Sequence, residues 1–491
     1  MQFFWYDYET FGTDARKDRV VQFAGIRTDA DLNTIDEPVV LFCRLTPDYL
    51  PSPSACAIHG ITPSELQQKG CSESEFAERV YCELTKPETC MVGYNAMRFD
   101  HEVTRFLFWR NLRDPYAWHW EDGNSRWDVI DLMRATYALR PAGIQWPTYP
   151  NGKQSFRLGD LARANGVLDG SAHDALVDVK ATLELARLVR NRQSRLFDYY
   201  LGLCDKGKVA EAMEQTFVWV SYKISPYRHC TAVMAALGRD LEYRFVVYAY
   251  DLASDPSDLV ALSEDELYDR LFPATRGKNL VHLYAINQKK NPFVVRHHLE
   301  EYTGRKNVLG GRVGRRLGID ETKLRKHLEI LQSDRQFAWR VRRVFKRARR
   351  ARDETADVDQ ALYEGFIDDK DRRKLDEMLK EGPMVSQAAC VEFADSRLPE
   401  LVFRYRARNF PEGLSADEKA RWVQHCRNVH LAPREEDGTT AMDRFAAALA
   451  AERAESPDKE SLLDQWEAHG KSIREALERG DVPAVYRCTG S

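Results

Sequence analysis

The feature that most constrains the fold is the alternation of two hydrophobic patterns over residues 1–190. Short apolar or aromatic runs bounded by polar residues, the pattern of buried strands, occur at 3–8, 20–27, 39–45 and 91–94. Stretches with helical periodicity occur between and after them, at 73–84, 99–111 and 173–190. Because strands and helices that interleave along a chain pack in layers, we expect an α/β domain here.

The hydrophobic pattern changes after about residue 195. Runs at 216–224, 243–252 and 279–286 are typical of antiparallel strands, and a helical stretch at 263–271 separates two of them. Helical periodicity then returns at 319–332, 362–380, 416–430 and 441–455. A chain of 491 residues is too long for one ordinary core, so we expect several domains, including a small β-rich one with a helical insertion.

Composition excludes several classes of protein. The chain is 43% hydrophobic and 30% charged, as folded soluble proteins are. No apolar run approaches the roughly 20 residues that span a bilayer, and the N-terminus lacks the pattern of a signal peptide. Ten scattered cysteines without a Cys-x-x-Cys pair favour reduced thiols in the cytoplasm over zinc or disulfides. With a net charge of −4, a nucleic acid must be bound by local basic patches.

Two carboxylates end the first predicted strand. Side chains alternate faces along a strand, so Asp7 and Glu9 point the same way and Tyr8 points into the core. Two carboxylates on one face repel each other unless a cation lies between them. A single Asp-x-Glu pair is also typical of a solvated strand end, so the pair alone is weak evidence.

Two further segments carry acidic residues and a histidine. Asp100 follows a strand and opens a helical stretch, where helix capping would also explain it. His173 and Asp178 are five residues apart, which places them about 140° apart around a helix. They would not share one stripe, but His173 lies at or before the first turn, where the backbone can direct its ring toward the carboxylates.

In combination, these segments resemble a known superfamily. Asp-x-Glu, Asn-x(3)-Phe-Asp and His-x(4)-Asp occur in the order of the three exonuclease motifs of the DEDDh superfamily. The chemistry agrees, because two divalent ions about 3.5–4 Å apart can stabilise the charge that develops during phosphodiester cleavage. Hard cations such as Mg²⁺ prefer carboxylate oxygens. The resemblance implies metal-dependent 3′→5′ exonuclease activity.

The superfamily resemblance also implies residue roles. Asp7 would bridge two Mg²⁺ ions, for which Mn²⁺ could substitute, and Glu9 and Asp178 would complete the site that holds the attacking water. Asp100 would reach the second ion through water. His173 would be the general base, since an ordinary histidine pKa of about 6.5 suits proton transfer at neutral pH.

Longer segments resemble one family, bacterial exonuclease I. They include Phe-Trp-Tyr-Asp-Tyr-Glu-Thr-Phe-Gly-Thr at 4–13, and the segments 22–29, 98–105, 114–118, 124–128, 137–141, 362–366 and 403–411. The similarity weakens only in parts of 200–320 and after 430. It implies an α/β RNase H-like exonuclease domain (1–193), a small SH3-like β domain with a helical insertion (194–345) and a C-terminal α-helical domain (346–491).

The family resemblance implies a monomeric, processive 3′→5′ exodeoxyribonuclease of DNA repair and recombination. It would release 5′-mononucleotides from single-stranded DNA and bind the C-terminal tail of single-stranded DNA-binding protein. Arg140 and Tyr199 are predicted to form part of a pocket for that tail. Single strands are held by basic grooves with aromatic platforms. The predicted DNA contacts in family-like segments are Arg105, Tyr116, Trp120, Arg134 and Arg157, and Thr10 and Phe11 are predicted to meet the terminal nucleotide.

Segment 335–352 is strongly basic and contains no acidic residue. Trp339 and Phe345 are interleaved with its arginines and lysines. Such a run can be a solvated interdomain helix, or it can contact DNA phosphates or an acidic protein tail. The sequence leaves both interpretations open.

Two alternative functions and one alternative catalytic base compete with this interpretation. An RNA-trimming DEDDh exonuclease or a proofreading subunit would be little more than a catalytic domain, which leaves the residues after 193 unexplained. A catalytically silent DNA-binding scaffold is disfavoured because all five catalytic side chains are present. His59 is a rival base, but its turn-rich surroundings favour a structural position or one near the terminal nucleotide.

Overall fold

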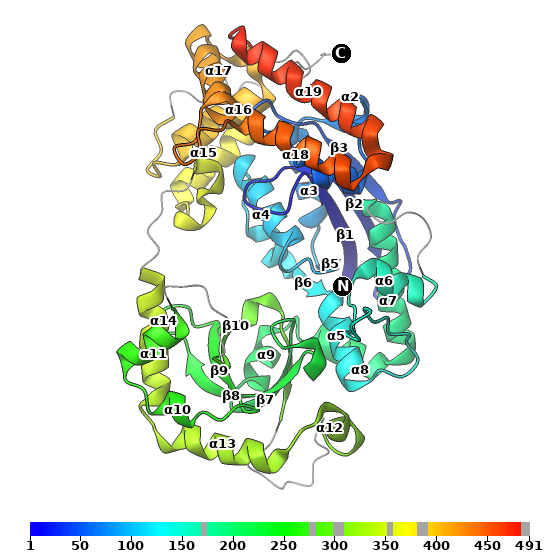
Figure 1. The fold of residues 1–491 in the computed structure, drawn as a ribbon, viewed down its shortest axis with the longest axis vertical. Helices are drawn as coiled ribbons and strands as arrows, with labels where there is room; N and C mark the ends of the chain where they lie inside the picture. The colour runs from blue at the N-terminus through cyan, green and yellow to red at the C-terminus, as the bar shows by residue number, and fades with distance from the viewer. Residues whose placement is uncertain (168–173, 274–280, 298–308, 351–356, 381–390, 483–491) are drawn as a thin grey trace. The chain divides into compact units, whose positions relative to one another are not determined.

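A computed structural model describes residues 1–167, 174–273, 281–297, 309–350, 357–380 and 391–482 (Figure 1). The chain divides into two compact units, and each is described by itself. The first comprises Met1–Ser125, Asp169–Lys180 and Thr355–Ser491, and the second comprises Arg126–Leu168 and Ala181–Glu354. The domain boundaries expected from the sequence stay a prediction, and in this division helix α7 (Ala175–Arg192) belongs in part to each unit.

The first unit contains strands β1 to β5 of a sheet with the strand order β4-β3-β2-β1-β5-β6, and only Ser125 of β6 belongs to this unit. The strands are β1 (Gln2–Thr10), β2 (Val20–Thr28), β3 (Val39–Cys43), β4 (Gly70–Cys71), β5 (Thr89–Gly93) and β6 (Ser125–Asp128). β1 pairs antiparallel with β2 and parallel with β5. Its residues Phe3, Phe4, Trp5 and Tyr6 are at most 1% exposed, as expected of a strand with both faces covered.

Helices cover this sheet. They are α1 (Pro53–His59), α2 (Pro63–Lys69), α3 (Glu73–Leu84), α4 (Asp100–Arg110) and the first turns of α7. Short 3₁₀ turns η1 (Ala117–His119) and η2 (Glu121–Gly123) follow α4. The core joins Phe23 of β2 to Phe76 of α3 and Leu107 of α4. The predicted α/β layers are therefore confirmed, with helix ends that differ from the sequence expectation by one or two residues.

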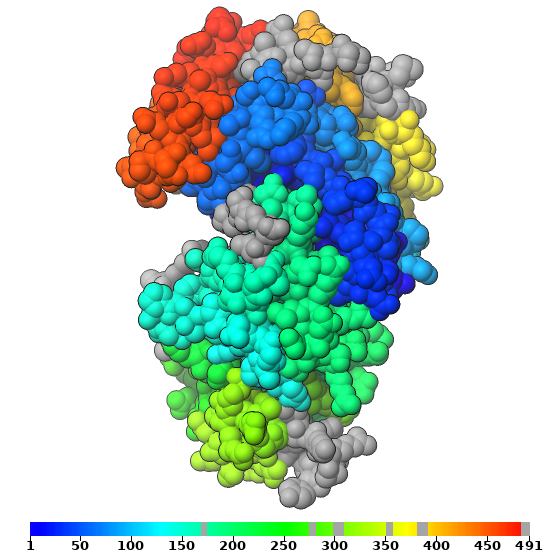
Figure 2. Space-filling model, turned by 90° about the vertical axis from the view of Figure 1, so that its right-hand side faces the viewer, coloured from blue at the N-terminus to red at the C-terminus, as the bar shows by residue number. Residues whose placement is uncertain are grey.

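The C-terminal helices belong to the same unit. They are η5 (Val358–Glu364), α15 (Asp369–Lys380), α16 (Leu398–Asn409), η7 (Pro411–Gly413), α17 (Ala416–Leu431), α18 (Ala441–Glu455), η8 (Pro457–Lys459) and α19 (Glu460–Glu478). α18 and α19 pack on α1, where Trp466 and Leu449 share one core with Phe11. The orange and red helices lie directly against the blue N-terminal region in Figure 2.

A cluster of buried charges also joins the C-terminal helices to the sheet region. Its members are Arg19, Asp48, Glu73, Arg110, Asp359 and Arg408, which we call the buried ion cluster. Arg408 of α16 donates to Oδ2 of Asp48 at 2.6 and 3.0 Å and also binds Asp359. Three arginines of the cluster face three carboxylates, and a fourth buried arginine, Arg404, lies 3.5 Å from Asp359.

The second unit contains a five-stranded antiparallel sheet with the order β10-β9-β8-β7-β11. The strands are β7 (Thr216–Val220), β8 (Thr231–Arg239), β9 (Val246–Asp251), β10 (Leu283–Asn287) and β11 (Phe293–Arg296). The helical insertion predicted at 263–271 is α11 (Glu264–Leu271), preceded by α10 (Ser257–Val260). The strand predicted at 243–252 begins later, at Val246, and the first two residues of the strand predicted at 279–286 lie outside the described residues.

The remaining helices of the second unit precede and follow this sheet along the chain, except for two short 3₁₀ turns, η3 and η4, that connect its strands. They are α5 (Val129–Leu139), α6 (Leu158–Ala164), α8 (Ser194–Gly202), α9 (Lys206–Ala212), η3 (Pro226–Arg228), η4 (Gln288–Lys290), α12 (Arg312–Leu317), α13 (Glu321–Ser333) and α14 (Phe337–Arg350). Within the described ranges, no helix is both long and apolar enough to cross a membrane.

The basic segment forms α14, and much of its charge is paired inside the second unit. Arg343 pairs with Glu264 at 2.9 Å and Arg347 with Asp265 at 2.6 Å. Further pairs are Arg340–Asp334, Lys346–Glu242 and Arg349–Asp240. Asp334 directly precedes the run, but the other acidic partners lie on distant segments, so the run itself does not reveal them. This pairing supports a structural role for α14; residues 351 and 352 lie outside the described part of the chain.

Candidate active site

β1 places two of the predicted catalytic carboxylates on one face. Asp7 lies opposite Ala24 and Glu9 opposite Gln22 in the β1–β2 pair, and the register shifts after Glu9. The Tyr8 side chain points the other way, is buried, and its hydroxyl lies 3.1 Å from that of Thr104. The alternation predicted from the sequence is therefore present.

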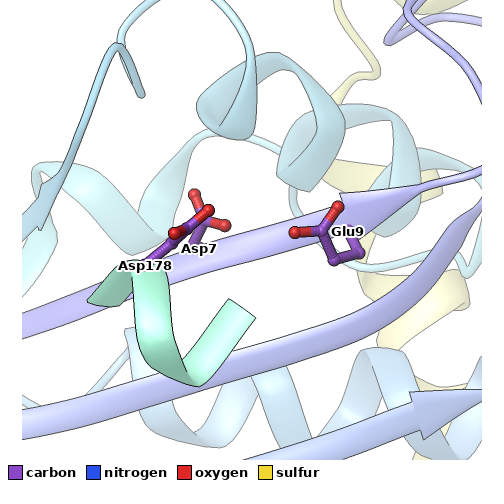
Figure 3. Close-up of side chains that lie close together, drawn as sticks. All are labelled: Asp7, Glu9 and Asp178. Atoms are coloured by element: carbon purple, nitrogen blue, oxygen red, sulfur yellow. The ribbon is translucent and has the colours of Figure 1, made fainter. Parts of the chain in front are cut away.

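The start of α7 brings a third carboxylate to the same place. Each of Asp7, Glu9 and Asp178 offers a carboxylate oxygen, and these oxygens lie within 4.8 Å of one another (Figure 3). A long stretch of chain, from the end of β1 to the start of α7, separates Asp178 from the other two. The described residues thus bring together three of the five predicted catalytic side chains as a group that could hold a metal ion.

Electrostatics at this carboxylate cluster favour a bound cation. Burial, followed by the charges of Asp100, Glu9 and Asp178, raises the pKa of Asp7 well above its ordinary value. Burial and neighbouring carboxylates, Asp178 first among them, raise the pKa of Glu9 to about 8. Oxygen ligands without sulfur or nitrogen suit hard divalent ions. A divalent cation would offset both the cost of burying charge and the mutual repulsion that raise these two pKa values.

Asp100 lies close to this cluster but is held differently. It is the first residue of α4, is 3% exposed, and accepts a hydrogen bond of 3.3 Å from the backbone N–H of Tyr8. The N-cap of α4 is Phe99, so capping does not explain Asp100. Its charge raises the pKa of both Asp7 and Glu9. This position is compatible with the expectation that Asp100 reaches a metal ion through water, which stays a prediction.

Of the two histidines considered as the base, the structure describes one. His173 lies outside the described residues, immediately before Asp174. The ring Nδ1 of His59 accepts from the Ile61 N–H at 3.0 Å, and the ring packs edge-on against Phe11. Burial lowers the pKa of His59 to about 4, which makes it a poor proton acceptor at neutral pH. These contacts favour the structural interpretation of His59.

The predicted terminal-nucleotide contacts, Thr10 and Phe11, are both buried. The Thr10 hydroxyl donates to the Gly12 carbonyl at 2.7 Å. Phe11 has no exposed surface, and its backbone N–H and C=O bond to the backbone of Arg19 and Ser52. The ring of Phe11 is therefore a core residue in this structure, and a DNA contact by either residue stays untested.

The predicted DNA contacts of the first unit form an aromatic and basic group. Arg105 is only 12% exposed; it pairs with Glu102 at 3.0 Å and donates to the Tyr363 hydroxyl at 3.1 Å. Its guanidinium carbon lies 5.3 Å from the ring centre of Tyr116. Trp120 is 61% exposed. Arg105 thus orients aromatic neighbours, whereas Trp120 offers an exposed ring surface.

The two predicted DNA contacts of the second unit, Arg134 and Arg157, also differ in how exposed they are. The Arg134 guanidinium is buried and pairs with Asp131 at 2.7 Å, close to the ring of Phe156. Arg157 is exposed, with its guanidinium carbon 5.6 Å from the ring centre of Tyr149. Arg157 is therefore the more accessible of the two cations.

The sequence did not single out two exposed aromatic residues of the first unit, Tyr363 and Phe366. Phe366 is 86% exposed, and its ring centre lies 5.9 Å from that of Tyr116. Tyr363, three residues earlier, bonds both Arg105 and Glu102. The segment was noted only for its family resemblance, because sequence alone does not distinguish an exposed ring from a core ring.

Arg140 and Tyr199 are brought together as predicted. They line one pocket of about 460 Å³ in the second unit. The other lining residues are Leu139, Arg192, Gln193, Ser194, Arg195, Leu196, Phe293 and Val295. Among the described residues, three arginines and no acidic side chain line this pocket, and apolar side chains complete it. An acidic peptide with an apolar end would be complementary.

The sheet with its partly buried carboxylate cluster belongs to a segment that matches exonucleases. Residues 4–186 match the family model "Exonuclease", 205–347 match "Exonuclease I SH3-like domain" and 356–473 match "Exonuclease I C-terminal domain". Exodeoxyribonuclease I of Escherichia coli K12 is 42% identical over 434 residues, covering 87% of this chain and 89% of that protein. The Haemophilus influenzae enzyme is 36% identical over 479 residues, covering 95% and 98%. The chain belongs to the exodeoxyribonuclease I family.

Solved structures agree with this assignment. Exonuclease I of Methylocaldum szegediense superposes with a TM-score of 0.87 at 40% identity, covering 96% of this chain and 99% of that one. E. coli exonuclease I in complex with a dA16 oligonucleotide gives a TM-score of 0.89 at 39% identity with the same coverage. An ExoI/SSB-Ct complex gives 0.86 at 38%, again covering 96% and 99%. The predicted fold class, an α/β exonuclease domain with SH3-like and helical C-terminal domains, is confirmed.

Proposed function

We propose that this protein is a processive 3′→5′ exodeoxyribonuclease that releases 5′-mononucleotides from single-stranded DNA. The observation that carries the proposal is the partly buried cluster of Asp7, Glu9 and Asp178 in a chain that matches all three exonuclease I family models. The relative solved with dA16 binds a DNA single strand. A monomer acting in cytoplasmic DNA repair and recombination fits this activity. Family-model matches support domains at about 1–193, 194–345 and 346–491.

We propose that Asp7, Glu9 and Asp178 hold Mg²⁺ ions directly and that Asp100 reaches a second ion through water. Divalent ions held by these carboxylates would stabilise negative charge on the reacting phosphate and the leaving oxygen. The chain's carboxylates supply the negative charge that retains the ions and orient them by their fixed positions on β1, α4 and α7. His173 accepts the proton of the attacking water. Mn²⁺ has the same preference for oxygen ligands and substitutes for Mg²⁺.

We propose that the exposed rings of the first unit stack on the bases of the strand. Trp120 and Phe366 offer the exposed surfaces, and Tyr116 lies between Arg105 and Phe366. Stacking on an aromatic ring is worth about 1–3 kcal/mol per base and tolerates any sequence. Arg105 and Arg134 act mainly by orienting neighbouring rings, and the exposed Arg157 is placed to bind phosphate.

A substrate comparison tests the proposed function. Single-stranded DNA labelled at its 5′ end should shorten progressively with Mg²⁺, and DNA labelled at its 3′ end should release labelled mononucleotide at once. Duplex DNA and a matched RNA oligomer should be degraded more slowly. Faster degradation of RNA would overturn the proposal in favour of an RNA-trimming exonuclease. Failure to release nucleotides with Mg²⁺ or Mn²⁺ would favour a silent scaffold.

We propose that the pocket containing Arg140 and Tyr199 binds the C-terminal tail of single-stranded DNA-binding protein. A relative was solved as an ExoI/SSB-Ct complex, and the arginines of the pocket suit an acidic tail. Arg140→Glu should weaken binding of a tail peptide about tenfold or more, measured by fluorescence anisotropy, because it places like charge against the peptide. Hydrolysis of short free oligonucleotides should be unchanged.

Arg163→Glu is the matched control for the tail pocket. Arg163 belongs to the same unit, is 60% exposed, and does not line the pocket. It should leave peptide affinity near that of the unaltered protein. Equal weakening by both variants would mean that the peptide responds only to overall charge.

A further inference from the structure

The side chain of Gln22 joins the strand beside Glu9 to the helix that carries Asp178. Gln22 is 2% exposed and lies opposite Glu9 in the β1–β2 pair. Paired residues on neighbouring strands point to the same face of a sheet, so the Gln22 amide lies on the face of the carboxylate cluster. It makes two hydrogen bonds there, both to the beginning of α7.

One of the two bonds needs an N–H donor and the other needs an oxygen acceptor, so together they fix which end of the Gln22 amide is nitrogen and which is oxygen. Gln22 Nε2 donates to Asp174 Oδ2 at 3.3 Å, and Gln22 Oε1 accepts from the backbone N–H of Ala175 at 3.1 Å. The other oxygen of Asp174 accepts from the N–H groups of Leu176 and Val177 at 3.0 and 3.2 Å. Gln22 and Asp174 together therefore satisfy three N–H groups that a helix start leaves without helical partners.

This pair of side chains, which we call the Gln22–Asp174 clamp, acts one turn before a proposed metal ligand. The first backbone bond of α7 runs from the Asp178 N–H to the Asp174 carbonyl at 3.0 Å. The clamp fixes both the position and the rotation of the helix start against β2. Asp178 projects from that same turn, so its carboxylate is located relative to Asp7 and Glu9 by the clamp.

We propose that Gln22 is a positioning residue of the active site, which holds the Asp178 carboxylate in register with Asp7 and Glu9 through the clamp. The inference deepens the proposed function and rests on it. Replacing a side chain that orients a metal ligand typically lowers metal affinity or activity by about 10- to 100-fold. Gln22 touches neither substrate nor reacting atoms in this role.

The complementarity of the clamp allows a partner-exchange test. Gln22→Glu places a carboxylate against that of Asp174, and Asp174→Asn places an amide N–H₂ against that of Gln22, so each single variant breaks the clamp. The double variant, Gln22→Glu with Asp174→Asn, restores a matched pair. The new carboxylate at position 22 accepts from both the Ala175 N–H and the new amide at position 174. The amide oxygen at 174 still caps α7, and the total charge equals that of the unaltered protein.

Two measurements on the full-length protein test the proposal. Calorimetric titration with Mn²⁺ without DNA should show affinity reduced about tenfold or more in each single variant and largely restored in the double variant. With saturating Mg²⁺ and single-stranded DNA, kcat should follow the same pattern while KM for DNA stays nearly constant. Gln68→Met, at an exposed glutamine of α2, is the control and should change neither quantity.

The outcomes separate this inference from the proposed function. If the unaltered protein releases no nucleotide with divalent ions, the proposed function fails first. If it is active and both single variants retain Mn²⁺ affinity and kcat, the positioning role is wrong. If the double variant is as impaired as the singles although its melting temperature is unchanged, partner exchange has failed and the clamp does not locate Asp178.

Discussion

Replacing Asp7 with alanine is expected to abolish nucleotide release by this protein. Asp7 lies on the central strand, and its carboxylate is surrounded by those of Glu9, Asp178 and Asp100. Without it the cluster loses the central one of its proposed metal ligands, and the rate with Mg²⁺ should fall about 10⁴-fold or more. Release of labelled mononucleotide from the 3′ end of single-stranded DNA measures the effect.

Three controls show that this loss is chemical. Binding of single-stranded DNA, measured with a chelator present, should be retained because aromatic and basic side chains hold the strand. Asp7→Asn keeps the shape and removes the charge; without metal it should melt no lower than the unaltered protein, because like-charge repulsion is relieved. Glu37→Ala, at an exposed carboxylate, should stay fully active. Digestion by Asp7→Ala at the unaltered rate would show that the metal assignment is wrong.

Replacing Arg408 with alanine is expected to lower the free energy of unfolding more than any other substitution described above. Its guanidinium lies between Asp48 and Asp359 in the buried ion cluster. Removing one partner of a buried ion pair leaves uncompensated charge and costs about 3–5 kcal/mol. Urea unfolding followed by fluorescence measures the free energy of unfolding. Because α16 shares this cluster with the sheet region, the loss should lower the stability of the first unit as a whole.

The pH dependence of that loss follows from the two carboxylates. Burial raises the pKa of each, but Arg408 and Arg19 outweigh it and hold the pKa of Asp48 and Asp359 below the ordinary value. A lowered folded-state pKa contributes stability above the unfolded value of about 3.9, and this contribution is lost as the pH falls through the folded pKa. The difference in unfolding free energy between the unaltered protein and Arg408→Ala should therefore shrink below about pH 4.

An exposed arginine of the first unit provides the comparison. Arg421 is 57% exposed and pairs with Glu400, so Arg421→Ala should cost about 0–1 kcal/mol. A loss for Arg408→Ala no larger than this would mean that the cluster contributes little to joining α16 to the sheet region.

Local patterns in the sequence were sufficient for the elements and for part of the site. The alternation of side chains along a strand placed Asp7 and Glu9 on one face, and helical periodicity located α3, α4 and α11 to within a few residues. Both patterns repeat over a few neighbouring residues, and the backbone geometry that produces them is local. The order of the three motifs and the family-like segments then indicated the class of enzyme.

Only the tertiary structure decided which distant side chains meet. It placed Asp178 with Asp7 and Glu9, buried the Phe11 ring, and supplied acidic partners such as Glu264 for α14. It also revealed the Gln22–Asp174 clamp, whose residues are separated by 152 positions. Burial and pairing depend on the approach of segments far apart in the chain, and no periodicity within one segment encodes that approach. The sequence by itself determined the carboxylates and their faces, and the packing of β1, β2, α4 and α7 determined that they form one site.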